Sequence, residues 1–212
     1  GDGVQYFMPH RLDRDTTGVM MVGKKLRIAA ALGKLFDGGQ VHKQYLAMCV
    51  SQAPGGSAAP SAPAHEWSGH PPELILSTGH GRSAHGLWRV YSAADVGAKL
   101  PGKGKPVKSM ETRLVQEGVQ GGGLLVGAYP KTGRTHQIRL HCLHAGIPLV
   151  GDVRYNGPEV WGGARWGGHL LHARALDFPH PVTGVAMALR APEPAWAKGD
   201  FEGPRFLAQD VN

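Results

Sequence analysis

The stretch MPHRLDRDTTGVMMVGKK (8–25) places Arg11, Asp13, Arg14 and Asp15 within five residues, close before an apolar segment. Two threonines and a glycine separate the charged residues from the apolar ones. Asp, Thr and Gly form turns readily and alternating charges are well solvated, so a charged surface turn is the simplest interpretation. Whether these residues do more depends on the rest of the chain.

The periodicity of the chain predicts more strands than helices. VMMV (19–22) is typical of a buried strand, and LRIAAALGKLF (26–36) has the apolar spacing of an amphipathic helix that ends near two glycines. Further strands are predicted in LILST (74–78), HGLWRVYSA (85–93), KSMETRLVQE (108–117), GGLLVGAYP (122–130), LLHARALDFPHP (170–181) and VAMALRAPEP (185–194), and in VHKQYLAMCV (41–50), whose side chains alternate between two faces. Because strands and helices do not alternate strictly, we expect an α+β fold with a mostly antiparallel mixed sheet flanked by helices and loops.

Three other segments complete this outline. A second helix is predicted between Gly133 and Gly146, where residues at helical spacing are followed by stop signals. The segment SQAPGGSAAPSAPA (51–64) lacks periodicity and predicts a mobile surface loop or insertion. KLPGKGKPVK (99–108) predicts a basic loop.

The composition of the chain limits the classes of protein to which it can belong. The 212 residues are 42% hydrophobic, which is enough for one substantial core. A net charge of +7 and a pI near 9.6 favour a polyanionic partner such as nucleic acid, although many basic proteins bind no nucleic acid and charge alone does not decide between the two classes. No run of 18 apolar residues and no signal-peptide pattern are visible, so no membrane span is expected. Cys49 and Cys142 lie far apart and predict buried thiols in a reducing compartment.

Three signatures of cofactor sites are incomplete in this chain. GHGRSA (79–84) is followed by a strand pattern, whereas a dinucleotide fold requires a helix there. GAYPKTGRT (127–135) has five residues between its glycines instead of four, and Arg134 stands where a phosphate loop has lysine. A third cluster lacks paired metal-ligand spacing, so histidines on a helix surface are the favoured interpretation. Its members are His136, His141, Cys142 and His144. We therefore expect no nucleotide cofactor and no metal.

The remaining candidates are single residues at the edges of predicted elements. They are Asp13, Tyr45, Arg134 and Arg139. If these edges converge, an arginine beside Asp13 would keep the carboxylate ionised and available as a nucleophile or a base. Spacing along the sequence does not establish this convergence.

Three ordered motifs in this chain resemble the signature set of the RluA-type pseudouridine synthases. These motifs are HRLDRDTTG (10–18), KQYLA (43–47) and KTGRTHQIRLH (131–141). The resemblance continues in the family's order through AGIPLVGDVRY (145–155), LHARALDFPHP (171–181) and LRAPEP (189–194). Within the family, the segment 86–112 is similar to plant and algal members.

The resemblance implies roles for the charged stretch and its partners. Asp13 matches the catalytic aspartate, and Arg11 matches the position that can enter the RNA when the target nucleotide leaves the stack. Tyr45 matches the active-site tyrosine that stacks on the uracil, and Arg139 matches the arginine that pairs with the aspartate. Other residues are expected to shape the site or to contact RNA. They are His10, Arg134, His136, Gln137, Lys103 and Lys105.

The function implied by the resemblance is the isomerisation of specific uridines to pseudouridine in structured rRNA or tRNA, centred on an aspartate and without a cofactor. The alternative is a non-catalytic RNA-binding scaffold that retains the fold. We expect one catalytic domain over residues 1–212, without the N-terminal strand segment that usually precedes the catalytic loop in the family. An intracellular location in the cytoplasm or an organelle is expected, and the oligomeric state is left open.

Overall fold

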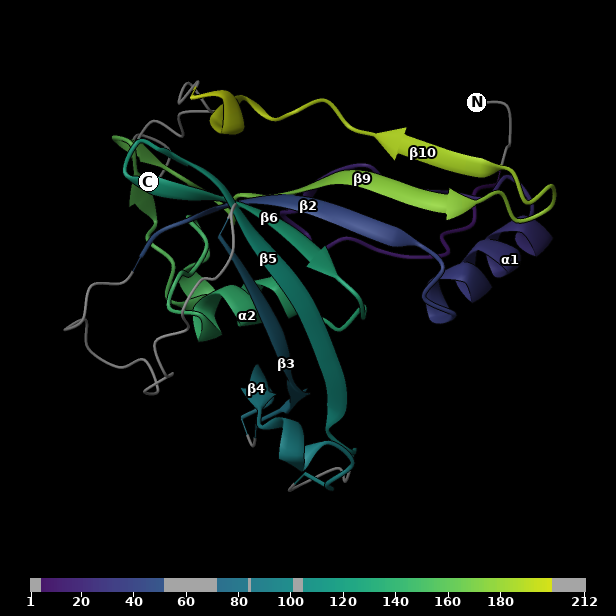
Figure 1. Ribbon diagram of the computed structural model, residues 1–212, viewed down its shortest axis with the longest axis horizontal. Coiled ribbons are helices and arrows are strands. Elements are labelled where there is room, and N and C mark those ends of the chain that lie inside the picture. The colour runs from purple at the N-terminus through teal and green to yellow at the C-terminus, as the bar shows by residue number, and fades with distance from the viewer. Residues whose placement is uncertain (1–4, 52–71, 84, 101–104, 200–212) are drawn as a thin grey trace, which may run out of the picture.

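A mixed, mostly antiparallel sheet organises the chain (Figure 1). The computed structural model describes residues 5–51, 72–83, 85–100 and 105–199. The strands are β1 (Thr17–Gly18), β2 (His42–Cys49), β3 (Glu73–Arg82), β4 (Trp88–Tyr91), β5 (Lys108–Gln120), β6 (Gly123–Pro130), β7 (Val160–Trp161), β8 (Ala164–Arg165), β9 (Leu171–Pro179) and β10 (Ala186–Arg190). The helices are α1 (Leu26–Asp37), α2 (Gln137–His144) and the short 3-10 helices η1 (Ala93–Asp95), η2 (Val153–Tyr155) and η3 (Ala195–Lys198).

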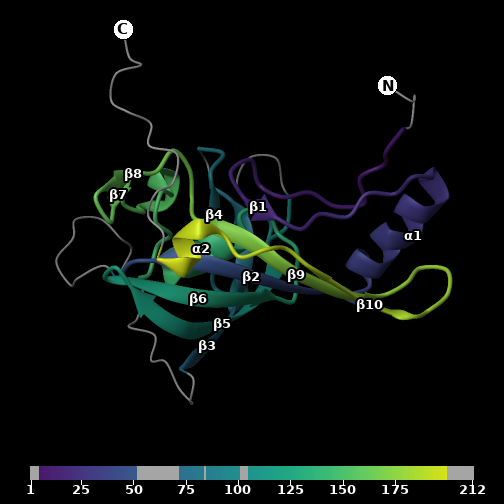
Figure 2. The ribbon, with the colours of Figure 1, turned by 90° about the horizontal axis from the view of Figure 1, so that it is seen from above.

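Eight strands form the main sheet in the order β1-β9-β2-β6-β5-β3-β4, with β10 paired to β9, while β7 and β8 form a separate pair. Only β1 pairs in parallel, with β9, among the strand pairs of the described residues. Figure 2 shows α1 at one end of the sheet and the β7–β8 pair at the other. The predicted α+β class with a mostly antiparallel sheet is confirmed.

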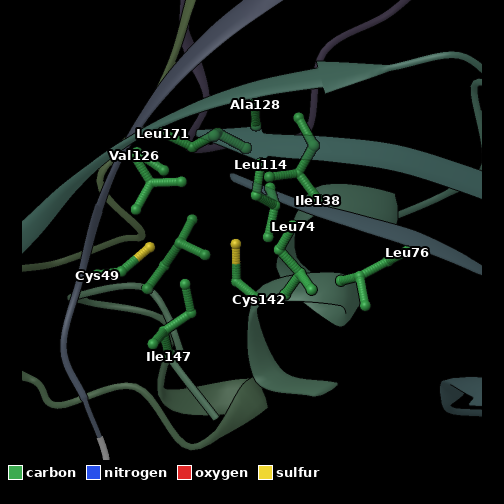
Figure 3. Packing of buried hydrophobic residues seen from close by; sticks show 12 residues of the cluster. Cys49, Leu74, Leu76, Leu114, Val126, Ala128, Ile138, Cys142, Ile147 and Leu171 are labelled. Carbon is green, nitrogen blue, oxygen red and sulfur yellow. The ribbon is translucent and has the colours of Figure 1, made fainter. Parts of the chain in front are cut away.

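The core is divided by the sheet because side chains of a strand alternate between its faces. From β2, Cys49 points toward α2, where Ile138 and Cys142 belong to the same apolar cluster (Figure 3), and Ala47 is also part of this cluster. The intervening side chains of β2 pack on the opposite face against the residues around β7, β8 and η3. This second cluster contains Leu46, Met48, Val150, Trp161, Trp166, Leu170 and Trp196. The predicted alternation of β2 is therefore confirmed, and both cysteines are buried free thiols.

The short strand β1 attaches the charged N-terminal loop to the sheet. Thr16 and Thr17 each hydrogen-bond a histidine near β9, with Oγ1 2.8 Å from His169 Nε2 and 2.8 Å from His172 Nδ1, respectively. Gly18 adopts φ +108°, and a Cβ built there would lie 2.2 Å from the carbonyl oxygen of Ala173. The sequence TTG thus provides two side-chain contacts and one close backbone approach, which fix the loop on β9.

Replacing Gly18 by alanine is expected to destabilise the fold by more than about 1 kcal/mol, because the left-handed backbone disfavours a side chain there and its Cβ would meet the Ala173 carbonyl. Gly33 provides the matched control: it lies inside α1 with open space around it, so Gly33→Ala should stabilise by about 0.5–1 kcal/mol. Urea unfolding of both variants measures the difference. Equal stabilities would contradict the tight attachment of the loop.

The predicted strand at VMMV (19–22) is wrong. The strand lies two residues earlier, at Thr17–Gly18, and the chain leaves the sheet after the Val19 amide donates to the Ala173 carbonyl at 2.8 Å. Of the four side chains, only Met21 is buried, whereas Met20 and Val22 are exposed. Apolar composition suggested a strand here, but the segment is a connection to α1.

The other predicted elements are confirmed with shifted ends. The first helix is α1, the second is α2, and the predicted strand LILST continues to Arg82, so that the glycines of GHGRSA lie within β3. The predicted loop 51–64 lies, apart from its first residue, outside the described residues, as do residues 101–104 of the predicted basic loop, which include Lys103. No helix of the described residues is long and apolar enough to cross a membrane.

Candidate active site

Segments from four parts of the chain meet around one cavity of about 410 Å³. The loop before β1 contributes Asp13, β2 contributes Tyr45, the turn after β6 contributes Arg134, and α2 contributes Arg139. The nearest oxygen of Asp13 lies 3.5 Å from Nη1 of Arg139. The convergence that spacing alone left open is therefore present in the fold, and the arginine carries the positive charge expected beside Asp13.

Arg139 is held in place by two residues after α2. Its Nε and Nη2 donate to the two carboxylate oxygens of Asp152 at 2.6 and 2.7 Å, and its guanidinium lies 4.9 Å from the centre of the Tyr155 ring. Burial opposes the charged form of Arg139, but the hydrogen bonds and negative charge of Asp152 outweigh it and raise its pKa. The guanidinium thus uses Nη1 for Asp13 while the rest of it is fixed by Asp152.

Asp152 and Tyr155 were missed as site residues in the sequence. The signal that could have identified them is the segment GDVRY (151–155) at the end of the motif 145–155, because it contains both residues. Asp152 is almost fully buried, so its carboxylate requires the pair with Arg139. Its role is to position Arg139.

Tyr45 forms part of the cavity wall and packs against the apolar cluster beneath α2. Burial, together with the negative charge of Asp13, raises the pKa of Tyr45 to about 12. The phenol is therefore neutral at physiological pH and can donate a hydrogen bond to a ligand. A role as a base would require its deprotonation, which this environment opposes.

The turn between β6 and α2 is fixed by Gln137. Its Oε1 accepts from Thr132 Oγ1 at 2.7 Å and from the Arg134 amide at 2.9 Å. Its Nε2 donates to the Glu111 carbonyl at 2.8 Å and to Thr112 Oγ1 at 2.9 Å. Because both polar atoms of its amide are engaged in these contacts, Gln137 fixes the turn that forms this part of the cavity wall.

The neighbouring loop residues lie at the cavity rim. Arg134 donates from Nε to the Ser109 carbonyl at 3.0 Å. His136 adopts a left-handed conformation, φ 57°, directly before α2, and its Nδ1 lies 2.7 Å from the Tyr155 hydroxyl. Both side chains line the cavity. Lys43, which the sequence analysis did not select, also lines it and donates from Nζ to the Thr132 carbonyl at 2.8 Å.

The remaining predicted RNA-binding residues differ in position. Arg11 is exposed and lines the cavity next to Asp13. Lys105 is exposed but is not among the residues that line the cavity. The prediction that the histidines around α2 lie on its surface is wrong for His141, which is fully buried and lies 2.9 Å from Thr78 Oγ1 and 2.8 Å from Thr112 Oγ1. Among the described residues, no three His, Cys, Asp or Glu side chains form a metal-binding group.

His10 lines the cavity at the start of the charged loop. Its Nε2 accepts a hydrogen bond from the Met21 amide at 2.9 Å, and its ring stacks on Phe36 with centroids 4.5 Å apart. Burial, assisted by the positive charge of Lys43, lowers the pKa of His10 to about 4. The ring is therefore neutral at physiological pH, and its Nε2 can accept the hydrogen bond from the Met21 amide only in this neutral form.

Stability is expected to fall as the pH decreases from about 6.5 to about 4, because over this interval the unfolded chain binds a proton at His10 that the folded chain does not. The His10→Asn variant lacks this proton and should lose about 1 kcal/mol less than the parent between about pH 7 and about pH 5. Urea unfolding at both pH values measures the two losses. The same loss in parent and variant would contradict the neutral, buried state of His10.

Comparison with known proteins identifies the family of the chain. The model of the RNA pseudouridylate synthase family matches residues 2–144. The chain belongs to this family. Curated relatives include RNA pseudouridine synthase 1 of Arabidopsis thaliana, which is 41% identical over 92% of this chain and 66% of the relative. The ribosomal large subunit pseudouridine synthase C of Escherichia coli K12 is 33% identical over 86% of this chain and 51% of the relative.

These relatives support an RluA-type member of the RNA pseudouridylate synthase family. The chain spans about half to two thirds of the length of the curated relatives it matches. Among solved structures, the human RNA pseudouridylate synthase domain containing 1 has a TM-score of 0.66 and 25% identity, over 92% of this chain and 72% of that chain. The fold expected from the family resemblance is therefore confirmed.

Proposed function

We propose that this chain is the catalytic domain of an RNA pseudouridine synthase, which isomerises uridines in structured rRNA or tRNA without a cofactor. The observation that carries the proposal is the Asp13 carboxylate, 3.5 Å from Arg139, in a cavity that also exposes Tyr45. Family membership and the net charge of +7 support RNA as the substrate.

The reaction breaks the N1–C1′ bond of uridine, turns the detached uracil and joins C5 to C1′. Substrate and product have the same atoms and oxidation state, so the isomerisation needs no redox partner. The target nucleotide must leave its helix or loop to reach Asp13, at a cost of a few kcal/mol that is smallest where the RNA is already distorted. Arg11, exposed beside Asp13, is suited to occupy the space that the nucleotide leaves.

The carboxylate of Asp13 can act at C1′, at C6 of the uracil, or on the proton at C2′, and all three routes use its ionised form. Arg139 faces it with a positive charge that cannot be lost at physiological pH. Tyr45 provides an aromatic surface for the uracil and a neutral hydroxyl that can donate to one of its oxygens. The cavity of about 410 Å³ has room for a nucleoside.

The proposal is tested by the release of tritium from RNA labelled at C5 of its uridines, because that hydrogen is lost when C5 bonds to C1′. Incubation of total RNA with the chain should release tritium above a control without protein, and digestion of the product should yield pseudouridine. RNA binding without release would contradict an enzyme and favour the scaffold alternative. Magnesium-dependent nucleotide binding would instead indicate a nucleotide enzyme that uses the 127–135 segment.

A further inference from the structure

A second cavity, also of about 410 Å³, adjoins the Asp13–Arg139 pair, because both residues line it. We call it the flanking cavity. Asp13 and Arg139 line both cavities, as do Arg11 and His136, so the two cavities are neighbours that share a wall at the ion pair. The flanking cavity is also lined by Arg14, Asp15, Gly151, Asp152, Val153, Arg154, Gly167, Gly168 and His169.

The two cavities differ in the chemistry of their walls. The candidate active site exposes the apolar or aromatic side chains of Tyr45, Ile138 and Leu171, which suit a base. Among the described residues that line the flanking cavity, Val153 is the only one with an aliphatic side chain, and none is Phe, Tyr or Trp. Its wall offers glycines, histidines and four arginines, a set that suits a phosphate group and not a stacked base.

Two of the four arginines that line the flanking cavity are available to bind a phosphate. Three carboxylates face it, but Asp152 is bound by Arg139, and Asp15 is bound by Arg14 at 2.9 Å. Asp13 is the third and also faces Arg139. The two other arginines of the wall, Arg11 and Arg154, form no ion pair with any carboxylate of the described residues.

The backbone around Arg154 is fixed. Tyr155 and Gly157 both donate their amides to the Asp152 carbonyl at 2.9 Å, which holds η2 as a tight turn. Behind it, Gly151 approaches Gly168 so closely that a Cβ at Gly151 would lie 2.0 Å from the Gly168 carbonyl. Arg154 therefore lies in a hydrogen-bonded turn that also contains Asp152, the partner of Arg139.

We propose that the flanking cavity binds a phosphate of the RNA strand adjacent to the target uridine, with Arg154 as the main phosphate ligand. The proposal rests on the proposed function, because it requires a ribose at Asp13. Only that ribose separates C1′ from the neighbouring phosphates, so a nucleotide seated in the first cavity extends its backbone along the shared wall. The exposed guanidinium of Arg154 can donate two hydrogen bonds to such a phosphate.

Binding of fluorescent oligo(U) and oligo(A) RNA over a range of KCl concentrations tests this assignment. Each phosphate contact to a single strand contributes about 0.7 to the slope of log affinity against log salt, so Arg154→Gln should reduce that slope by about 0.7 for both RNAs. Arg154→Lys should keep the slope of the parent chain. Arg27→Gln is the matched control, since it removes one exposed charge from α1, outside both cavity walls, and should leave the slope unchanged.

The tritium assay separates this inference from the proposed function. If the flanking cavity holds a phosphate, Arg154→Gln raises KM for RNA by about three- to tenfold and leaves kcat within about twofold. If the parent chain releases tritium but Arg154→Gln has an unchanged salt slope, the phosphate site is contradicted and the proposed enzyme activity is retained. A parent chain without release but with the reduced slope in the variant would overturn the enzyme and retain a phosphate-binding cavity.

Discussion

The Asp13→Asn variant is expected to release tritium about 10³-fold more slowly than the parent chain, or not at all, while its affinity for RNA stays within about threefold. Asparagine preserves the size of the side chain and removes its negative charge. It can therefore neither attack carbon nor accept a proton, whichever route the reaction takes. RNA affinity depends mainly on phosphate contacts by other residues, so it should be retained.

Asp15 supplies the control for this experiment. It lies two residues away in the same loop, but its carboxylate binds the exposed Arg14. Asp15→Asn removes the same charge from the same loop and should keep tritium release within a few-fold of the parent, because an exposed ion pair contributes little, about 0–1 kcal/mol. Full activity of Asp13→Asn would exclude Asp13 as the reacting group. Equal loss in both variants would assign the effect to the loop and not to one carboxylate.

Asp152→Ala is expected to lower the free energy of unfolding by about 3–5 kcal/mol, because it leaves the buried guanidinium of Arg139 without its main partner. The exposed fractions of the two side chains, 9% for Arg139 and 2% for Asp152, mean that water cannot replace the lost contact. Activity should also fall, since the contact with the Tyr155 ring alone would hold Arg139 less firmly in the orientation that presents Nη1 to Asp13. Urea unfolding and tritium release measure the two effects.

The pair between Arg165 and Glu159 offers a direct comparison. Its atoms are equally close, 2.6 Å, but the side chains are 61% and 43% exposed. Glu159→Ala should therefore cost less than about 1 kcal/mol. Similar losses in Asp152→Ala and Glu159→Ala would contradict the role of Asp152 as a buried counter-charge, since the two variants differ mainly in burial.

The sequence predicted the sheet well because alternation along strands such as β2 is a local property. The pairing of Asp13 with Arg139 was expected only from the family resemblance, since 126 residues separate them and no periodicity relates them. Asp152 had no such assignment: its burial depends on where the segment after α2 returns, which no local pattern encodes. The same reason applies to His141, which the sequence analysis predicted to lie on the helix surface. Its ring is buried because the pairing of β3 with β5 places Thr78 and Thr112 next to it.

The attachment of β1 to β9 has a consequence for how the protein reaches its working state. Thr17 and its partner His172 are separated by 155 residues, and contacts of such long sequence separation form slowly because a long loop must close first. The Asp13 loop therefore lacks its attachment to β9 until this last long strand has been synthesised and has joined the sheet. A chain still emerging from the ribosome carries Asp13 before β9 is present to hold the loop, so under the proposed function we expect the site to be assembled only after β9 has been synthesised.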